Sequence, residues 1–224
     1  MVLWFLISVT LVVFVGSEPV FPDSEFHCNK WGKIVSRTAG FIAAGVNAPL
    51  KGGQKNDPFT FIVIGANTGS NSNDPLWKAM HSRRRDTYSV FVEPIPFIFK
   101  ELQANMEKNN MEKATCVNAA ISNTNQNLTL YCTGMKKDGT IATEDGFDMW
   151  AKQMCSTSTA HLYQIHRPEA VDKYLSVYHV LGMSVRALVK TYATHAPVKI
   201  VQIDVEGMDD VVSACYTCQL PTPY

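Results

Sequence analysis

The chain has 224 residues and a formal net charge of zero, with 20 basic and 20 acidic side chains. Its length allows one ordinary domain, and a hydrophobic fraction of 46% supports a sizeable core and excludes a wholly disordered chain. The balanced charge argues against a general binder of nucleic acid or anionic membranes, since neutralising phosphates requires an excess of Lys and Arg. We therefore expect a globular domain with no nucleic-acid partner, and its function has to be sought in its motifs.

The first residues have the composition of a secretory signal. Residues 2–15 carry no charge, and only Ser8 and Thr10 interrupt the apolar run. This run is short for a bilayer span, which needs about 20 apolar residues, but it fits the core of a signal peptide. We predict a signal peptide over residues 1–17, cleaved after Ser17. The alternatives are an uncleaved membrane anchor through residues 2–15 and, third, a buried first helix. A signal peptide or an anchor would place the chain in the secretory pathway, secreted or in the lumen of the ER or Golgi.

The cysteines do not form a recognisable framework. Six cysteines in 224 residues are too sparse for a domain built on disulfides. Cys116 lies in an apolar run and is expected to be a core thiol. Cys215 and Cys218 form a CxxC pair, but no second pair stands at zinc-binding spacing, so we expect no metal site.

After a leader over residues 18–58, with a short helix expected at 34–46, the sequence alternates between expected strands and helices. Continuous β-branched and aromatic runs predict buried strands at residues 59–64 and 88–92. Further strands are expected at 114–120 and 198–205, with another short strand at 128–132. Apolar spacing predicts a helix over 96–111, and residues 169–192 also have helical character. This alternation is typical of an α/β fold with an open, mostly parallel, Rossmann-like sheet and flanking helices.

Ligands of such sheets bind outside the carboxyl ends of the strands, so the residues that follow each strand are candidate site residues. Gly65, Asn67 and Gly69 form a loop of small residues after the first predicted strand. Its GxxxG spacing is not the GxGxxG of dinucleotide-binding folds, and no GK[ST] follows, which argues against a Rossmann dehydrogenase and a P-loop. A purely structural turn remains the alternative for this loop.

Acidic residues follow two other predicted strands. Glu93 comes after the second strand, where a carboxylate can accept hydrogen bonds from both hydroxyls of a ribose, although it could also be a surface acid. Asp204 and Glu206 end the last strand two residues apart, so in extended backbone they point to the same side. Such a pair could hold a cation, orient a substrate hydroxyl or accept its proton, with a solvated loop as the alternative.

Four blocks of the sequence together resemble the FkbM-type family of S-adenosylmethionine-dependent methyltransferases. The blocks are FIVIGANTGSNSND, VFVEPIPFIFKELQANM, VNAAIS and VKIVQIDVEGMDDVV, which occur in the order of that family across residues 59–212. The segments VEPIP and IDVEG are the most distinctive. The resemblance implies a class I methyltransferase fold over residues 59–212, S-adenosylmethionine as cofactor, and methyl transfer to a hydroxyl oxygen of a glycan or small-molecule acceptor.

The resemblance also implies roles for individual residues. Gly65, Asn67 and Gly69 would surround the amino-acid portion of the cofactor, Glu93 would hold the ribose hydroxyls, Asn118 to Ile121 would lie by the adenine, and Asp204 and Glu206 would face the transfer site. Asn118 and Ile121 are thus the expected bounds of the adenine contact.

The sequence also departs from the family pattern. Val63 stands where an acid commonly precedes the first loop, and the class I fold has more strands than we can identify before the irregular tail at 213–224. We therefore expect the sheet to be incomplete at its C-terminal side. Two alternatives stay open: an inactive methyltransferase-like domain with a binding role or none, and a NAD-type oxidoreductase, which the absent GxGxxG disfavours.

Overall fold

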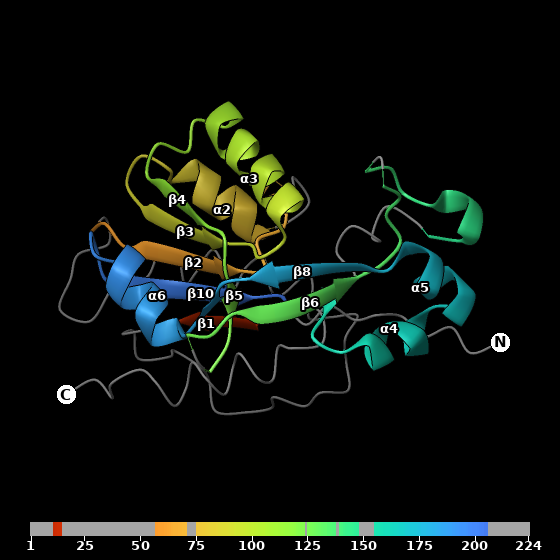
Figure 1. Cartoon of the computed structure of the whole chain (residues 1–224). Coiled ribbons are helices and arrows are strands. Elements are labelled where there is room, and N and C mark those ends of the chain that lie inside the picture. Colours follow the sequence, from red (N-terminus) through yellow and green to blue (C-terminus); the bar gives the residue numbers. More distant parts are fainter. Residues whose placement is uncertain are drawn as a thin grey trace, which may run out of the picture.

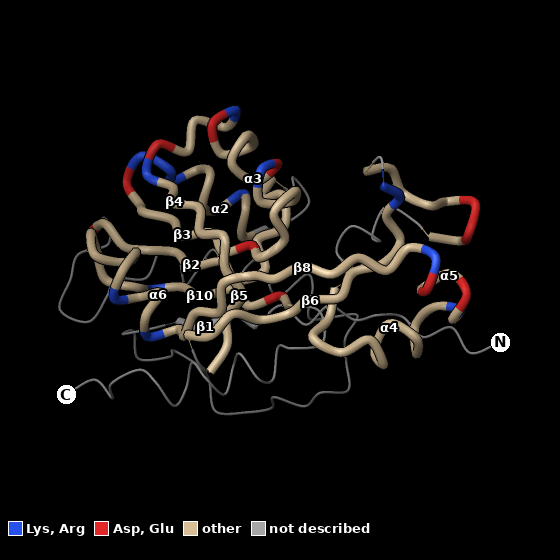
Figure 2. Tube along the Cα trace, viewed as in Figure 1, with Lys and Arg blue, Asp and Glu red and all other residues tan. Residues whose placement is uncertain are grey.

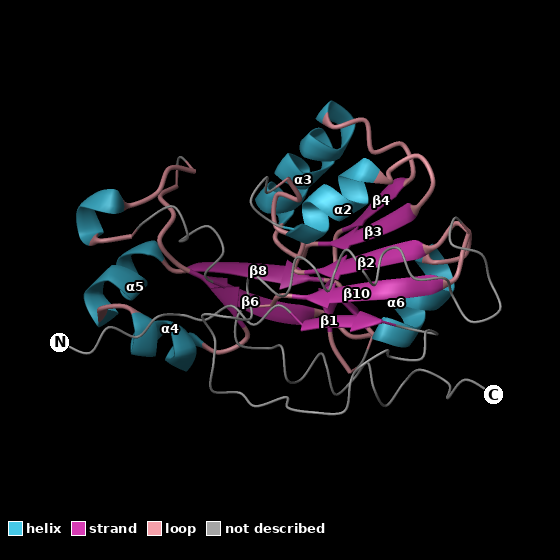
Figure 3. Ribbon diagram, turned by 180° about the vertical axis from the view of Figure 1, so that it is seen from behind, coloured by secondary structure: helices cyan, strands magenta, loops and turns pink. Residues whose placement is uncertain are grey.

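A computed structural model describes residues 11–14, 57–70, 75–123, 125–137, 139–147 and 155–205. Its main sheet has five strands in the order β1-β10-β2-β3-β4, seen side by side in Figure 3. The strands are β1 (Leu11–Phe14), β2 (Thr60–Ile64), β3 (Tyr88–Val92), β4 (Ala114–Val117) and β10 (Val198–Ile203). The strands expected at 59–64, 88–92, 114–120 and 198–205 therefore all belong to one sheet.

The order of these strands reverses beside β2. β2, β3 and β4 follow one another outward in parallel, and β10 then pairs in parallel with the opposite edge of β2. The order β4-β3-β2-β10 corresponds to 3-2-1-4 in the Rossmann arrangement. The prediction of an open, mostly parallel, Rossmann-like sheet is confirmed, and the point of reversal lies between β2 and β10.

Helices cover both faces of the main sheet (Figure 1). Alternate residues of β2 point to opposite faces, so Phe61 and Val63 pack under α2 (Pro75–Ser82) and α3 (Pro96–Lys108). Ile62 and Ile64 pack on the other face, against α6 (Val185–Tyr192). Because all five residues of β2 are buried, the continuous apolar run in the sequence is explained by two covered faces.

A long insertion between β4 and α6 forms a second, smaller sheet. Its strands β6 (Leu128–Cys132), β7 (Cys155–Ser156) and β8 (Ser176–Val180) pair antiparallel in the order β7-β6-β8, while β5 (Ala120–Ile121) pairs with β9 (Gly182–Met183). The insertion extends away from the main sheet and ends in a 3-10 helix (Thr143–Asp145), α4 (Thr159–Ile165) and α5 (Pro168–Tyr174) (Figure 1).

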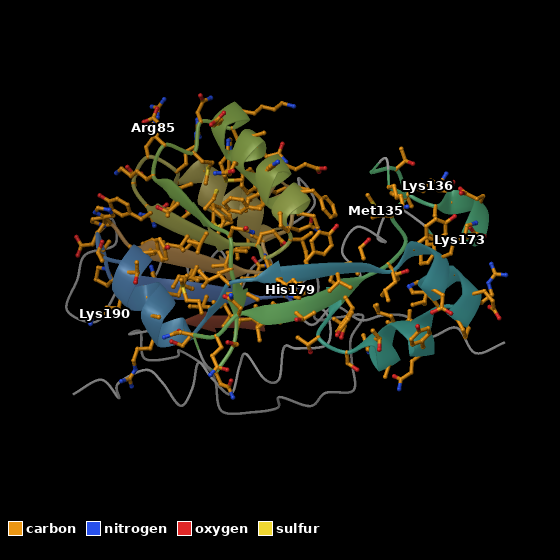
Figure 4. All side chains as sticks on the ribbon, in the orientation of Figure 1. Arg85, Met135, Lys136, Lys173, His179 and Lys190 are labelled. Carbon is orange, nitrogen blue, oxygen red and sulfur yellow. A yellow bond between two sulfur atoms is a disulfide. The ribbon has the colours of Figure 1, made fainter. Side chains whose placement is uncertain are left out.

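Charged side chains lie at the end of the insertion and not along its strands. β6 and β8 carry no Asp, Glu, Lys or Arg (Figure 2). Lys136 and Lys173, which Figure 4 labels at the outer end, pair with Glu144 at 2.9 Å and Asp145 at 2.7 Å. These pairs surround a small buried cluster that includes Phe147, so the outer end has its own core.

The expectation of a helix over residues 169–192 is wrong in its middle. The structure has α5 up to Tyr174, then β8 and β9, and only then α6. Val177 is 50% exposed, whereas Tyr178 and Val180 pack inward, which is the alternation of a strand. Antiparallel pairing of β8 with all of β6 stabilises this extended form, so a tertiary contact overrides the local helical spacing.

One further strand boundary and two helices differ from the sequence reading, and one short strand agrees with it. The strand expected at 114–120 ends at Val117, because the chain leaves the main sheet to form β5. Helices α2 and α4 were not anticipated. The predicted strand at 128–132 is confirmed residue for residue as β6.

The apolar N-terminal run contributes to the main sheet. Leu11–Phe14 form β1, which pairs antiparallel with β10 at its outer edge. The expected short helix at 34–46 and the tail at 213–224 lie outside the described residues. Within the part of the chain that the structure describes, no helix has the length and apolar character to cross a membrane.

Candidate functional site

A cleft opens at the carboxyl ends of β2, β3 and β10, where the strand order reverses. Its near side is lined by Ile64, Gly65, Asn67, Val92, Glu93, Pro94, Asp204 and Val205; its other sides by Ile95, Ile98, Ala119, Ala120, Ile121, Leu128, Leu130, Cys155, Ser156 and Thr157. This is where open α/β sheets bind their ligands. Five of the eight residues singled out from the sequence line this cleft: Gly65, Asn67, Glu93, Ile121 and Asp204.

Gly65 allows the first loop to pass close to the end of β10. Its backbone has φ +76°, and a Cβ at this position would lie 1.8 Å from the carbonyl oxygen of Asp204. The amide nitrogens of Gly65 and Ala66 both donate to the carbonyl oxygen of Val92, at 3.0 and 2.9 Å. Backbone hydrogen bonds therefore hold the loop to the end of β3, and its close approach to β10 requires glycine at position 65.

The rest of the loop divides into a part in the cleft and a part outside it. The backbone N–H of Asn67, a residue with φ +49°, donates to Oε2 of Glu93 at 2.9 Å. Gly69 lies outside the cleft lining, and a Cβ there would meet Leu102 and Met106 of α3. Gly69 thus lets the loop pack on α3, which is a structural role that the sequence did not distinguish from cofactor contact.

Glu93 is a buried carboxyl group in the floor of the cleft, with only 5% of its surface exposed. Its two oxygens accept hydrogen bonds from the backbone N–H groups of Asn67 and Ile95, both at 2.9 Å. Burial raises the pKa of Glu93 to about 7, although these two hydrogen bonds favour the ionised form. A small change in its surroundings can therefore change its charge near neutral pH.

Asn118 and Ile121, the expected bounds of an adenine contact, have different positions. The Asn118 side chain is exposed, lies outside the cleft lining, and donates to the carbonyl oxygens of Glu93 at 2.8 Å and Pro94 at 3.0 Å. It thereby supports the turn that carries Glu93. Ile121 is buried and lines the cleft together with its neighbour Ala120, so the apolar wall is formed by β5.

Asp204 lines the cleft after β10, which pairs with the edge of β2 opposite to β3, the strand that Glu93 follows. It follows β10 directly, and its backbone N–H donates to the carbonyl oxygen of Ile64 at 3.0 Å. Its side chain is half-buried. Glu206 lies outside the described residues. Over the described ranges no group of three or more His, Cys, Asp or Glu is placed to hold a metal ion.

The far wall of the cleft comes from the insertion and was missed by the sequence reading. Leu128 and Leu130 of β6 contribute apolar surface, and Ser156 and Thr157 contribute hydroxyl groups. Cys155, which precedes them, forms a disulfide with Cys132 of β6. No motif marks these residues, because a wall of common side chains is defined only by the folding of the insertion over the sheet.

Comparison with known proteins assigns no family to the chain. No family model matches the chain, and no curated protein matches it either. The cleft itself combines a buried carboxyl group at the end of β3 with the loop that begins at Gly65. A second carboxylate, Asp204, follows β10 beside the reversal of strand order.

Proposed function

We propose that the chain is an S-adenosylmethionine-dependent methyltransferase with a class I fold, which methylates a hydroxyl oxygen of a glycan or small-molecule acceptor. The observation that carries the proposal is the carboxyl group of Glu93, buried in the cleft floor beside the reversal of strand order. An acid at the end of the second strand is where Rossmann-like folds bind ribose hydroxyls. The resemblance of the GANTG, VEPIP and IDVEG segments to FkbM-type methyltransferases selects this cofactor from among nucleosides.

The hydrogen bonds of Glu93 fit a ribose. A carboxylate offers about four lone-pair sites. The N–H groups of Asn67 and Ile95 each approach one of its two oxygens, so each oxygen keeps acceptor capacity for one of two adjacent hydroxyls. The apolar wall at Ala120 and Ile121 offers a surface on which a base can lie.

S-adenosylmethionine would supply an already activated methyl group, so the chain mainly has to hold the acceptor oxygen in line with it. The acceptor hydroxyl must also lose its proton. Asp204 is the carboxylate assigned to this role, because it lines the cleft, is half-buried and follows β10, on the other side of β2 from the strand that carries Glu93. Glu206, two residues further along the sequence, is the second acid to which we assign this role.

We also propose that the chain works in the secretory pathway, where glycan acceptors are available. The disulfide between Cys132 and Cys155 supports this location, since such bonds persist in oxidising compartments. The apolar composition of residues 2–15 gives independent support.

The first test measures calorimetric binding of S-adenosylhomocysteine to the full chain and to Glu93→Ala. We expect the parent to bind and the variant to lose binding. Glu107→Ala is the matched control, because Glu107 is an exposed acid on α3 outside the cleft and its removal should leave affinity unchanged. Equal binding by parent and Glu93→Ala would contradict the site assignment, and binding of NAD in place of S-adenosylhomocysteine would favour an oxidoreductase.

The second test separates cofactor binding from methyl transfer. Asp204→Asn removes a proton acceptor without changing the size of the side chain, so it should bind S-adenosylhomocysteine like the parent and lose turnover on any acceptor that the parent methylates. Turnover by Asp204→Asn at the parental rate would remove Asp204 from the mechanism. A parent that binds cofactor but methylates none of a panel of hydroxylated acceptors would favour the inactive, binding domain.

A further inference from the structure

One part of the far wall, the segment Cys155–Thr157, has only a short strand pairing within the described residues. β7 consists of Cys155 and Ser156, and it pairs with β6 at two positions only, Tyr131↔Ser156 and Cys132↔Cys155. By contrast, β8 pairs with β6 at five positions on the other edge. Strand pairs as short as β6–β7 are marginal by themselves in water.

The covalent bond between Cys132 and Cys155 coincides with this weak pairing. Cys132 is buried among Ile95, Ile98 and Leu130, so one end of the disulfide is fixed in the cluster that joins the small sheet to the start of α3. The other end is Cys155, which is partly buried against the same cluster and lines the cleft. Ser156 and Thr157 follow directly and line the cleft too.

The helix that follows, α4, contacts β7 and makes no covalent link to it. α4 begins at Thr159, and its one buried residue is Leu162. The hydroxyl of Ser156 accepts a hydrogen bond from the backbone N–H of Ser158 at 3.2 Å, which is a local bond within the same segment. The disulfide is therefore the strongest described link between the segment Cys155–Thr157 and the rest of the cleft.

We propose that the Cys132–Cys155 disulfide is the positioning element of the cofactor cleft: it holds Ser156 and Thr157 as the far wall, so that tight ligand binding requires the oxidised protein. A dithiol reductant would supply two electrons and two protons, converting the disulfide to the thiols of Cys132 and Cys155 while the dithiol becomes a cyclic disulfide. The freed segment then opens locally and the ligand loses one wall. The inference rests on the proposed function for the identity of the ligand.

The binding test uses the full chain and S-adenosylhomocysteine. We expect the Kd of the oxidised parent to rise by about tenfold or more after treatment with dithiothreitol, and to rise equally in the double variant Cys132→Ala/Cys155→Ala without reductant. Cys116→Ser is the matched control, since Cys116 is a half-buried free thiol outside the cleft and its loss should change nothing. Parent and double variant with the same Kd, both folded by circular dichroism, would overturn the proposal.

Hydrogen exchange gives a readout that needs neither a ligand nor a folded variant. In the parent, reduction should speed exchange of the Ser156 and Thr157 amides and leave the amides of β2 protected. Exchange that rises equally in β2 and β7, or in neither, would overturn the proposal. If the oxidised parent binds no S-adenosylhomocysteine, the proposed function is rejected, and the exchange experiment still decides whether the disulfide holds the wall.

Discussion

The carboxyl group of Glu93 is subject to two opposing influences. Burial favours its protonated form, and the N–H groups of Asn67 and Ile95 favour the carboxylate, with the net result that its pKa is raised to about 7. Ribose hydroxyls donate hydrogen bonds, so they also favour the carboxylate. Ligand binding should therefore lower this pKa and release a proton below neutral pH.

We accordingly predict that affinity for S-adenosylhomocysteine rises with pH until about 7 and is constant above. Below the raised pKa of Glu93, each pH unit should weaken binding by about tenfold, because the protonated group must first lose its proton. Calorimetry between about pH 5.5 and 8.5 measures this slope, and Asp204→Asn should keep it. An affinity that does not vary over this range would show that Glu93 does not accept hydrogen bonds from the ligand as a carboxylate.

Gly65 offers a second prediction at the level of one residue. Gly65→Ala should lower the free energy of unfolding by about 2 kcal/mol or more, because the new Cβ would meet the carbonyl of Asp204 and φ is +76°. Gly139→Ala is the control for backbone strain alone, since Gly139 has φ +82° and nothing within 4 Å of a Cβ, and it should cost about 1 kcal/mol. Urea denaturation of both variants tests the difference, and equal losses would mean that the loop moves away from β10 without cost.

Sequence reasoning located the near side of the cleft and missed its far side. Gly65, Glu93 and Asp204 could be found because each directly follows a strand, and the ends of parallel strands meet at one edge. Asn118 also follows a strand, but its side chain supports the backbone of Glu93 instead of lining the cleft. Ser156 carries no such signal, because its place depends on pairing across a long insertion.

At the level of elements, local patterns identified β2 and β6 but not β8. β2 is buried on both faces and was recognised from its apolar run alone. β8 has one exposed face, a close antiparallel partner in β6 and residues that also fit a helical spacing. Its extended form is decided by pairing with a segment nearly fifty residues away, as in Thr129 with His179, and a local pattern does not contain that information.

The start of α6 gives a prediction for one element. Ser184 precedes the helix in extended backbone, and its hydroxyl accepts from the N–H of Ala187 at 3.2 Å, which is an N-cap. Ser184→Ala should lower the free energy of unfolding by about 1 kcal/mol, whereas Ser184→Asp should keep the cap and the stability. Thr191→Ala, on the exposed side of the same helix, serves as the control. Chemical denaturation that gives the same midpoint for Ser184→Ala and Thr191→Ala would contradict the cap.

At the scale of the whole molecule, the main sheet and the small sheet of the insertion both line one cleft. The main sheet supplies the loop and the two carboxyl groups, and the insertion supplies the far wall. The two parts are joined by the cluster of Ile95, Ile98, Leu130 and Val180, where the start of α3 packs under the small sheet. The alternation of strands and helices along the sequence predicts the main sheet, because its strands follow one another in chain order. The small sheet depends on pairing between segments that lie far apart in the sequence.

The outer edge of the main sheet connects fold and localisation. Leu11–Phe14 lie in the run that we interpret as a signal, and in the structure they pair with β10 from Ile203 to Ile200. Cleavage after Ser17 would remove this strand and leave the edge of β10 without it, and an open edge lowers stability and invites association. If residues 11–14 are a strand of the stable sheet, removing them should destabilise the chain; if they act only as a signal, removing them should not.

We predict that a chain of residues 18–224 has a free energy of unfolding lower by about 1–3 kcal/mol than the full chain, because the backbone hydrogen bonds between β1 and β10 are lost. A chain of residues 11–224 is the matched control: it lacks the first ten residues but keeps β1, and it should unfold like the full chain. Urea denaturation with light scattering compares the three. If residues 18–224 unfold at the same midpoint without association, β1 contributes nothing to the stable sheet, and the apolar run is left to act only as a signal.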